Sequence, residues 1–489
     1  AWRSGVFGTE AAGTDRGESP FAAGDGGVPA TPSSPTPTVS PTPGPINTEF
    51  EGLTTFRGNA TRTYYGKGPV PTNPKVLWRF PESGGLCHES TDASGTRVWC
   101  GTGWTGQPNV VEVEDGPAQV RFGAYSGAVH VLNARTGREL YEPFPTGDII
   151  KGTVTSDPDG FPLLYTGSRD NYFRILALDR GDRPRELWSL HANSAPNRVW
   201  NDDWDGSALV IDDYLLEGGE NSWFYVVKLN RGYDDRGRVT VDPEIRMTVP
   251  GYDDRLFADV GDQEVSIENS VAFDASRAIV YFANSGGLVQ GWDVSDVLQG
   301  GDQYRRVFRF WTGDDTDASI VIDDEGFLYV ASELQRFNAR SKRVGQLMKL
   351  DPSKPRDPLV WSVDASDTGP EGLGGMWATA GLWRDAVFAA TNSGEILAVS
   401  RETGKVRWKI ELPPPTWTSP VIVDGVLIVG DCAGVLHAYE LRDRPLAGRP
   451  KQLWRVKLEG CIESTPAVWD GMVYVGSRGG AVYGIGDRR

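Results

Sequence analysis

The sequence predicts an all-β protein, a single eight-bladed β-propeller of four-stranded antiparallel blades. Three observations predict this fold. A unit of short alternating strands repeats along most of the chain, as in radially repeated β-architectures. Glycine, at 60 of 489 residues, is too abundant for a helical protein, because it costs roughly 1 kcal/mol per helical position relative to alanine. The last unit also ends one strand short, and a segment near the N-terminus has the form of the missing strand.

The two C-terminal units show the repeated pattern most clearly. Residues 417–440 contain three alternating apolar segments, the first two separated by Asp424-Gly425 and the next by a glycine-containing turn. Residues 463–484 repeat this order, with Asp470-Gly471 and Gly479-Gly480 at the corresponding turns. Such dipeptides between alternating segments are typical of β-hairpins, because glycine accepts a positive φ. Each unit is therefore expected to form a small antiparallel meander.

A small residue that opens the first strand, here called the anchor, places every unit in one register. The anchors are Gln107, Thr153, Ser207, Ser270, Ser319, Thr379, Ser419 and Thr465. They lie 40 to 63 residues apart, a spacing typical of propeller blades. We expect residues 76–80 to supply the fourth strand of the eighth unit and close the ring, which removes the open sheet edges. Seven blades with an irregular first unit is the structural alternative.

Large aromatic residues recur in the fourth strands of these units. They are Tyr141, Trp188, Trp311, Trp361, Trp408 and Trp454. Aromatic side chains bury a large apolar area, so we expect them to pack between neighbouring blades.

The rest of the chain divides into two further segments. Residues 1–49 are poor in large apolar side chains and contain seven prolines between Pro29 and Pro45, so they are expected to be a disordered tail or linker. This tail is either a floppy end or a stalk that joins the folded part to a removed signal or membrane anchor. Residues 50–75 are too aromatic for a linker and are expected to form an ordered strap across a face of the propeller. Residues 76–489 form the propeller.

Charge and hydropathy exclude several classes of function. The formal net charge of −17 argues against a nucleic-acid partner, because phosphate contacts need clustered lysine and arginine. No stretch approaches 18 uninterrupted apolar residues, so no transmembrane span is expected in this chain. We expect a monomer.

One unit carries a recognisable repeat motif. The run from Ala398 to Trp408, which contains Thr403-Gly404, resembles the tryptophan-docking repeat A-x-D-x-x-T-G-x-x-x-W, with Ser400 in place of the aspartate. A second, weaker copy keeps Thr136-Gly137. The chain thus resembles the PQQ-like eight-bladed propeller superfamily, which includes quinoprotein alcohol dehydrogenases and BamB-type outer-membrane assembly lipoproteins. The resemblance covers about 410 residues and implies the fold, whereas the superfamily hosts both enzymes and scaffolds.

The four cysteines fit two disulfides. Cys87 and Cys100 flank one excursion before the first unit, while Cys432 and Cys461 lie in loops that emerge on one face from adjacent blades. Pairing as Cys87–Cys100 and Cys432–Cys461 implies an oxidising, extracytoplasmic location. The alternative is four free buried thiols in a cytosolic protein. Scattered histidines and the absence of C-x-x-C argue against zinc.

The repeat register also predicts which residues meet at the channel mouth. The position two residues before each anchor holds Thr105, Lys151, Asp205, Glu268, Asp317, Trp377, Trp417 and Glu463, here called the mouth ring. First strands line the channel of a propeller, so four carboxylates, one lysine and two tryptophans are expected to converge. This composition favours a cation or polar-ligand site with aromatic walls. The alternative is a wet channel whose polar side chains are simply solvated.

One segment raises the possibility of an enzyme. Residues 200–207 resemble the H-D-x-W-D-x-x-G segment of quinoprotein alcohol dehydrogenases, which implies Asp205 as a general base and Trp204 at the ligand site. Glu268 and Asn269 would then be calcium ligands beside the quinone PQQ. Asn201 stands where the family has histidine, and the chain has no adjacent Cys-Cys pair.

The leading hypothesis is a non-catalytic binding or scaffold protein without a cofactor, acting on another extracytoplasmic protein or a cell-envelope ligand. It would be secreted, periplasmic or anchored at the cell surface through a lost N-terminal segment. The alternative is a PQQ- and calcium-dependent alcohol or sugar dehydrogenase that uses Asp205.

Overall fold

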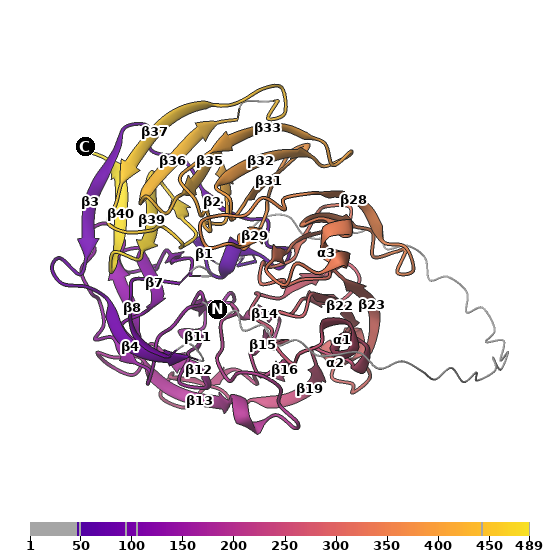
Figure 1. Cartoon of the computed structure of the whole chain (residues 1–489). Helices are drawn as coiled ribbons and strands as arrows, with labels where there is room; N and C mark the ends of the chain where they lie inside the picture. The colour runs from indigo at the N-terminus through magenta and orange to yellow at the C-terminus, as the bar shows by residue number, and fades with distance from the viewer. Residues whose placement is uncertain (1–45, 48–49, 93–94, 104–105, 442–443, 489) are drawn as a thin grey trace.

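Eight antiparallel sheets surround a common centre in the computed structural model of the chain (Figure 1). The structure describes residues 46–47, 50–92, 95–103, 106–441 and 444–488. The predicted eight-bladed propeller is confirmed, and the seven-bladed alternative is excluded.

Each blade follows the predicted meander order from the centre outward. Blade 1 contains β6 (Asn109–Val111), β7 (Gln119–Ala124), β8 (Ala128–Asn133) and β9 (Phe144–Pro145), and blade 2 contains β10 (Thr155–Ser156), β11 (Leu163–Gly167), β12 (Tyr172–Ala177) and β13 (Arg185–His191). Blade 3 contains β14 (Leu209–Ile211), β15 (Tyr214–Gly218), β16 (Trp223–Lys228) and β19 (Glu244–Pro250), and blade 4 contains β20 (Ala272–Asp274), β21 (Ile279–Phe282), β22 (Leu288–Asp293) and β23 (Arg305–Trp311). Blade 5 contains β24 (Val321–Ile322), β25 (Leu328–Ala331), β27 (Leu347–Leu350) and β28 (Leu359–Val363). Blade 6 contains β30 (Gly381–Trp383), β31 (Ala386–Ala390), β32 (Glu395–Ser400) and β33 (Val406–Glu411). Blade 7 contains β34 (Val421–Val423), β35 (Val426–Gly430), β36 (Val435–Glu440) and β37 (Lys451–Lys457).

Blade 8 is closed by the N-terminal strand, as the sequence predicts. Its C-terminal strands are β38 (Ala467–Trp469), β39 (Met472–Ser477) and β40 (Ala481–Asp487). The outer strand β3 (Pro74–Phe80) pairs antiparallel with β40, and Val76 lies opposite Ile485. Figure 1 shows the indigo β3 beside the yellow β40. The two ends of the propeller are therefore held in one sheet.

The anchors form hydrogen bonds from blade to blade. The Ser207 amide donates to the Ser270 hydroxyl at 2.9 Å, and the Ser270 amide donates to the Ser319 hydroxyl at 3.0 Å. The same bond joins Ser319 to Thr379, Thr379 to Ser419, and Gln107 to Thr153. A hydroxyl on a short side chain is needed because it must reach the next backbone across a narrow gap. This explains why serine and threonine recur at the anchors.

The tryptophans of several fourth strands dock on the following blade. Trp361 donates its indole N–H to the Arg401 carbonyl at 3.0 Å, and Trp408 donates to the Pro445 carbonyl at 2.7 Å. A side-chain carbon added to Gly404, which has a φ of +70°, would lie 2.8 Å from the Trp361 ring. The Thr-Gly of the repeat therefore supplies the space in which the preceding tryptophan packs.

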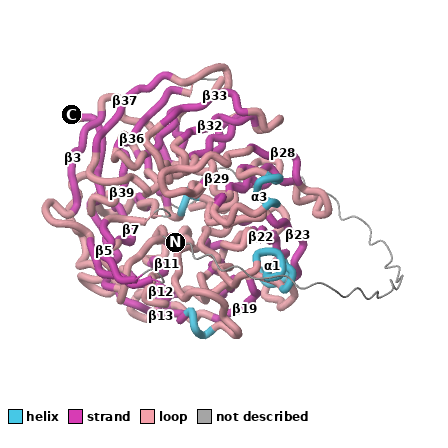
Figure 2. Tube along the Cα trace, viewed as in Figure 1, coloured by secondary structure: helices cyan, strands magenta, loops and turns pink. Residues whose placement is uncertain are grey.

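The segment from Glu51 to Lys67, treated above as part of a strap, runs across the middle of the ring and is here called the channel segment. It contains β1 (Gly52–Leu53), the 3₁₀ turn η1 (Phe56–Gly58) and β2 (Gly66–Lys67). β1 pairs with β6 of blade 1, and β2 pairs in parallel with β38 of blade 8. Figure 2 shows the short helix of η1 near the centre of the ring.

The channel segment is hydrogen-bonded to the inner side of all eight blades. Backbone bonds join it to blades 1, 2, 4, 5 and 8 through Glu112, Ser156, Phe273, Ile322 and Asp470. The Thr55 hydroxyl donates to the Ala208 carbonyl of blade 3 at 3.0 Å, and the Arg57 guanidinium donates to the Ala380 and Pro420 carbonyls of blades 6 and 7.

A second arginine of the channel segment is also fully buried. Arg62 donates to the carbonyls of Val271, Phe56 and Ser207 at 2.8, 2.8 and 3.1 Å. Burial lowers the pKa of Arg62 to about 9, while nearby Glu217 opposes this shift. The centre of the propeller is thus filled by the chain's own residues.

Short insertions decorate the blades. The helices are η2 (Ala192–Ser194), α1 (Asp254–Val260), α2 (Ser295–Leu298) and α3 (Ala339–Val344). The extra strand pairs are β4 (Cys87–Asp92) with β5 (Gly95–Cys100), β17 (Gly232–Tyr233) with β18 (Val239–Thr240), and β26 (Glu333–Leu334) with β29 (Gly374–Gly375). Among the described residues, no helix has the length and hydropathy to cross a membrane.

Both predicted disulfides are present. Cys87–Cys100 closes the β4–β5 hairpin, and Cys432–Cys461 joins the loops of blades 7 and 8. No described cysteine is free, so the alternative of four free thiols is wrong for this structure. Disulfides persist in oxidising compartments, which favours an extracytoplasmic location.

Candidate functional site

The candidate site is the channel mouth, where two kinds of loop meet. One kind leads into the first strand of a blade and carries the mouth ring. The other kind joins the second and third strands of the same blades. The described mouth-ring residues Lys151, Asp205, Glu268, Asp317, Trp377, Trp417 and Glu463 are all buried, and Thr105 lies outside the described residues.

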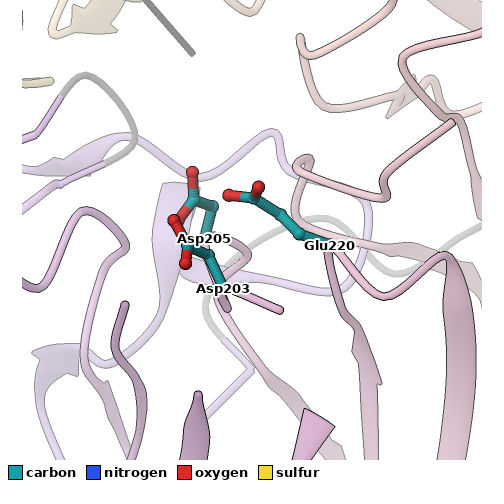
Figure 3. A group of neighbouring side chains, drawn as sticks. All are labelled: Asp203, Asp205 and Glu220. Atoms are coloured by element: carbon teal, nitrogen blue, oxygen red, sulfur yellow. The ribbon is translucent and has the colours of Figure 1, made fainter. Parts of the chain in front are cut away.

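Lys151 lies at the centre of a carboxylate cluster (Figure 3 shows its three acidic members). Its ammonium group pairs with Asp205, with Glu220 at 2.9 Å and with Asp203 at 3.4 Å. Arg169 donates a further hydrogen bond to Asp203 at 2.7 Å. The three carboxylates could hold a metal ion by their spacing, but the Lys151 ammonium already supplies a positive charge to them.

The Lys151 cluster separates the protonation states of its carboxyl groups. Burial, and then the negative charge of Glu220, raises the pKa of Asp205 well above its usual value, although Lys151 opposes the shift. Burial acts in the same direction on Glu220, but Lys151 and a hydrogen bond from Asp205 lower the pKa of Glu220 to about 2. The pKa values of these two carboxyl groups beside Lys151 are therefore shifted in opposite directions.

A second cluster lies beside blade 5 and is here called the Asp317 cluster. Carboxylate oxygens of Asp315, Asp317 and Glu333 lie within 4.8 Å of one another. Ser285 connects it to Glu268, because the serine hydroxyl contacts Glu268 at 3.1 Å and Asp317 at 3.4 Å. No lysine lies within ion-pair distance of these carboxylates among the described residues, and the nearest guanidinium, that of Arg336, is 3.9 Å from Asp315.

Glu333 is the most exceptional member of the Asp317 cluster. Its side chain is 97% buried, with 3% exposed, yet its carboxyl group forms no hydrogen bond or ion pair with any described residue. Burial and then Asp317 raise the pKa of Glu333 well above its usual value. Burial and then Asp315 and Glu268 do the same for Asp317. Buried carboxyl groups that repel one another in this way would be stabilised by an added cation.

The two tryptophans of the mouth ring continue the wall from this cluster. Trp377 donates its indole N–H to Asp317 at 3.1 Å, and Trp417 donates to Asn392 at 3.1 Å. Their rings meet edge to face, with centroids 4.7 Å apart and an interplanar angle of 89°. Glu463 lies apart from them and pairs with Arg478 at 3.3 Å.

Two sequence candidates do not join the mouth. Trp204 packs in the core between Phe173 and Tyr225, with its indole N–H donated to the Asn171 carbonyl at 3.1 Å. The amide of Asn269 donates to the Ala283 and Thr316 carbonyls and accepts the Ala283 N–H. Both side chains hold the propeller wall together through these contacts.

A second set of loop residues also surrounds the mouth and was not predicted from the sequence. In every blade, one such residue stands two positions after a Gly or Ala at or next to the end of the second strand. These residues are Tyr125, Arg169, Glu220, Ser285, Glu333, Asn392, Cys432 and Arg478. Their register repeats as regularly as that of the anchors, so a second alignment of the units would have found them.

The charge balance of the mouth decides which ligands it fits. Nine buried carboxyl groups gather there, namely Asp203, Asp205, Glu220, Glu268, Asp314, Asp315, Asp317, Glu333 and Glu463. The neighbouring bases are Lys151, Arg169, Arg336 and Arg478, all paired with carboxylates. PQQ is a tricarboxylate and needs basic groups to receive it. Because the bases among the described residues are already paired with carboxylates, these residues do not fit the three carboxylates of PQQ.

Comparisons with known proteins support the resemblance drawn from the repeats. Residues 343–446 match a family described as outer membrane protein assembly factor BamB. No curated protein sequence matches the chain.

Solved structures give likenesses of fold. Quinohemoprotein alcohol dehydrogenase from Comamonas testosteroni is 13% identical with a TM-score of 0.57, covering 90% of this chain and 81% of its own. Saccharomyces cerevisiae Sqt1 is 12% identical with a TM-score of 0.55, covering 85% and 100%. BamB from Moraxella catarrhalis is 15% identical with a TM-score of 0.40, covering 86% and 99%. Together with the eight blades, the family match and the first of these structures confirm the resemblance to PQQ-like propellers.

Proposed function

We propose that this PQQ-like propeller is a non-catalytic extracytoplasmic binding protein whose acidic mouth receives a positively charged group. The group belongs to a cell-envelope partner protein or to a polar ligand. The observation that carries the proposal is the excess of buried carboxyl groups over bases among the described residues of the mouth. Above all, the Glu333 carboxyl group in the Asp317 cluster has no hydrogen-bond or ion-pair partner among them.

The two clusters have different parts in this function. Lys151 and Arg169 pair with the carboxylates of the Lys151 cluster, so we assign this cluster to shaping the mouth. The Asp317 cluster lacks a lysine among its described neighbours and is bordered by Trp377. A cation beside an aromatic wall gains from the ring quadrupole as well as from the carboxylates. The Asp317 cluster is therefore the receiving site.

A dehydrogenase is the second candidate, favoured by the likeness of fold to an alcohol dehydrogenase with a TM-score of 0.57. It requires Asp205 to accept a proton at neutral pH. The pairing of the Asp205 carboxylate with the Lys151 ammonium opposes that role.

Calorimetric titration of the full chain with Ca²⁺, and separately with a trilysine peptide, tests the proposal. We expect at least one of these probes to bind, and Glu333→Gln to weaken its binding by about tenfold or more. Glu395→Gln is the matched control, because Glu395 pairs with Lys409 on the surface of blade 6. Absence of binding by both probes, or equal weakening by the control, would contradict the proposal.

A dye-linked oxidation assay with alcohols and sugars, after addition of PQQ and Ca²⁺, separates the two candidates. We expect no turnover. Turnover that disappears in Asp205→Asn would establish the dehydrogenase instead.

A further inference from the structure

A basic cavity lies between blades 4 and 5 and shares no lining residue with the acidic mouth. Its volume is about 760 Å³, and α1, the end of β23, α3 and the loop before β28 form its walls. Figure 1 shows both helices beside β23. Small-molecule sites in proteins commonly have volumes of about 300 to 1,000 Å³, so the cavity has the size of a ligand site.

Five arginines line this cavity: Arg255, Arg309, Arg340, Arg343 and Arg356. Only two acidic residues, Asp259 and Asp357, line it with them. The lining thus carries a net charge of about +3, from five arginines and two aspartates, in a chain whose formal net charge is −17. The overall composition of the chain therefore does not explain why arginines predominate in the lining of this cavity.

The arginines differ in how far the protein already satisfies them. Arg309 is held by Asp253 through two hydrogen bonds of 2.9 Å, so it is largely structural. Arg255 lies 3.7 Å from Asp259. Arg343 and Arg356 are exposed, and their guanidinium groups form no hydrogen bond or ion pair with any described residue.

Arg340 is the positioned member of the group. It donates its Nε–H to the Trp311 carbonyl at 2.7 Å, and its guanidinium lies 5.4 Å from the Phe310 ring centroid. Its two terminal nitrogens form no hydrogen bond with any described residue. Burial and then the charge of Arg343 lower the pKa of Arg340. A guanidinium fixed by one edge and crowded by like charges is well placed to receive an anion.

We propose that this cavity binds a small phosphate-bearing anion, such as a pyrophosphate or a phosphate ester. Guanidinium groups recognise tetrahedral oxyanions through paired N–H donors, and several together suit more than one phosphate group. The concave shape argues for a molecule that enters the cavity rather than for a flat lipid surface. The ligand is independent of the cation that the mouth receives.

Titration of the full chain with sodium pyrophosphate in EDTA tests the proposal, because EDTA removes any metal that could bridge pyrophosphate to the acidic mouth. We expect one binding site per chain, with an affinity that falls at least fivefold between 20 and 200 mM salt because exposed charges are screened. Arg343→Ala with Arg356→Ala should weaken binding at least tenfold. Arg340→Lys should also weaken pyrophosphate binding, since lysine keeps the positive charge but lacks the paired N–H donors of the guanidinium group.

Arg407→Ala is the matched control, because Arg407 is an exposed arginine on the outer strand β33 of blade 6. It should leave the affinity within twofold of the parent. No binding at millimolar pyrophosphate, or equal weakening by Arg407→Ala, would overturn the proposal. Sedimentation with phosphatidylglycerol vesicles without pyrophosphate binding would also overturn it and identify a lipid surface as the source of phosphate.

Discussion

Replacement of Lys151 by methionine tests how the mouth is held together. The substitution keeps the side-chain length and removes the ammonium group that pairs with Asp203, Asp205 and Glu220. Removal of one partner from a buried ion pair typically costs about 3–5 kcal/mol, because the remaining charge is left buried and uncompensated. Arg169 still contacts Asp203 at 2.7 Å, so we expect a loss near the lower end, about 3 kcal/mol at pH 7.5.

The loss should depend on pH in a defined direction. In the parent, Lys151 holds the pKa of Glu220 at about 2, below its usual value, so this group stabilises the fold above pH 4.5 and loses that effect as the pH falls through 2. Without Lys151, burial dominates and the pKa of Glu220 rises above its unfolded value. The penalty of the variant is then largest at pH 7.5 and shrinks toward pH 5 as the carboxylate takes up a proton.

Urea denaturation of parent and variant at pH 7.5 and pH 5 measures this effect. Lys349→Met is the matched control, because Lys349 is also buried but donates to the Arg401 carbonyl at 3.2 Å and lies over the Phe327 ring. The control should cost about 1 kcal/mol with no relief at pH 5. A Lys151→Met loss below 1 kcal/mol at pH 7.5, or one that grows at pH 5, would refute the account of the cluster.

Two further substitutions test the scaffold. Gly404→Ala should lower the free energy of unfolding by about 2 kcal/mol, since the φ of +70° is strained for alanine and the added carbon meets the Trp361 ring; Gly448→Ala, in open space, should be neutral in the same denaturation assay. Arg62→Met should cost about 3 kcal/mol, because several buried carbonyls lose their donor, including that of Ser207. A stability within 0.5 kcal/mol of the parent would contradict the structural role of the channel segment.

The fold could be predicted because the same sequence pattern recurs in every blade. The anchors recur once per blade, and each performs the same task, a hydrogen bond from one blade to the next such as that between Ser319 and Thr379. Closure by residues 76–80 and the disulfide Cys432–Cys461 followed from the same register. A prediction based on many equivalent positions tolerates an error at any one of them.

The candidate site was predicted only in part. It depends on contacts between residues at two different repeat positions, and only one of these positions was aligned in the sequence. Lys151 and Asp205 came from the mouth ring, but their partner Glu220 belongs to another loop of the same blade as Asp205. Trp204 was predicted at the ligand site but packs in the core against Phe173, because a resemblance in eight residues does not determine where a loop side chain packs. The sequence also did not predict that the channel is filled, because Arg57 and Arg62 form hydrogen bonds with residues of blades that are far away in sequence.

The basic cavity lies where the chain departs from its own repeat, whereas the mouth is built from positions that recur in every blade. The anchors of blades 3 and 4 are 63 residues apart and those of blades 5 and 6 are 60 apart, against 40 for blades 6 and 7. The longer units hold α1 and α3, which build the basic cavity, and the loop with Glu333. Because the channel segment fills the centre, a ligand must reach the mouth from one face. The repeated positions of the blades thus supply the residues of the mouth, and the inserted helices α1 and α3 supply arginines of the basic cavity.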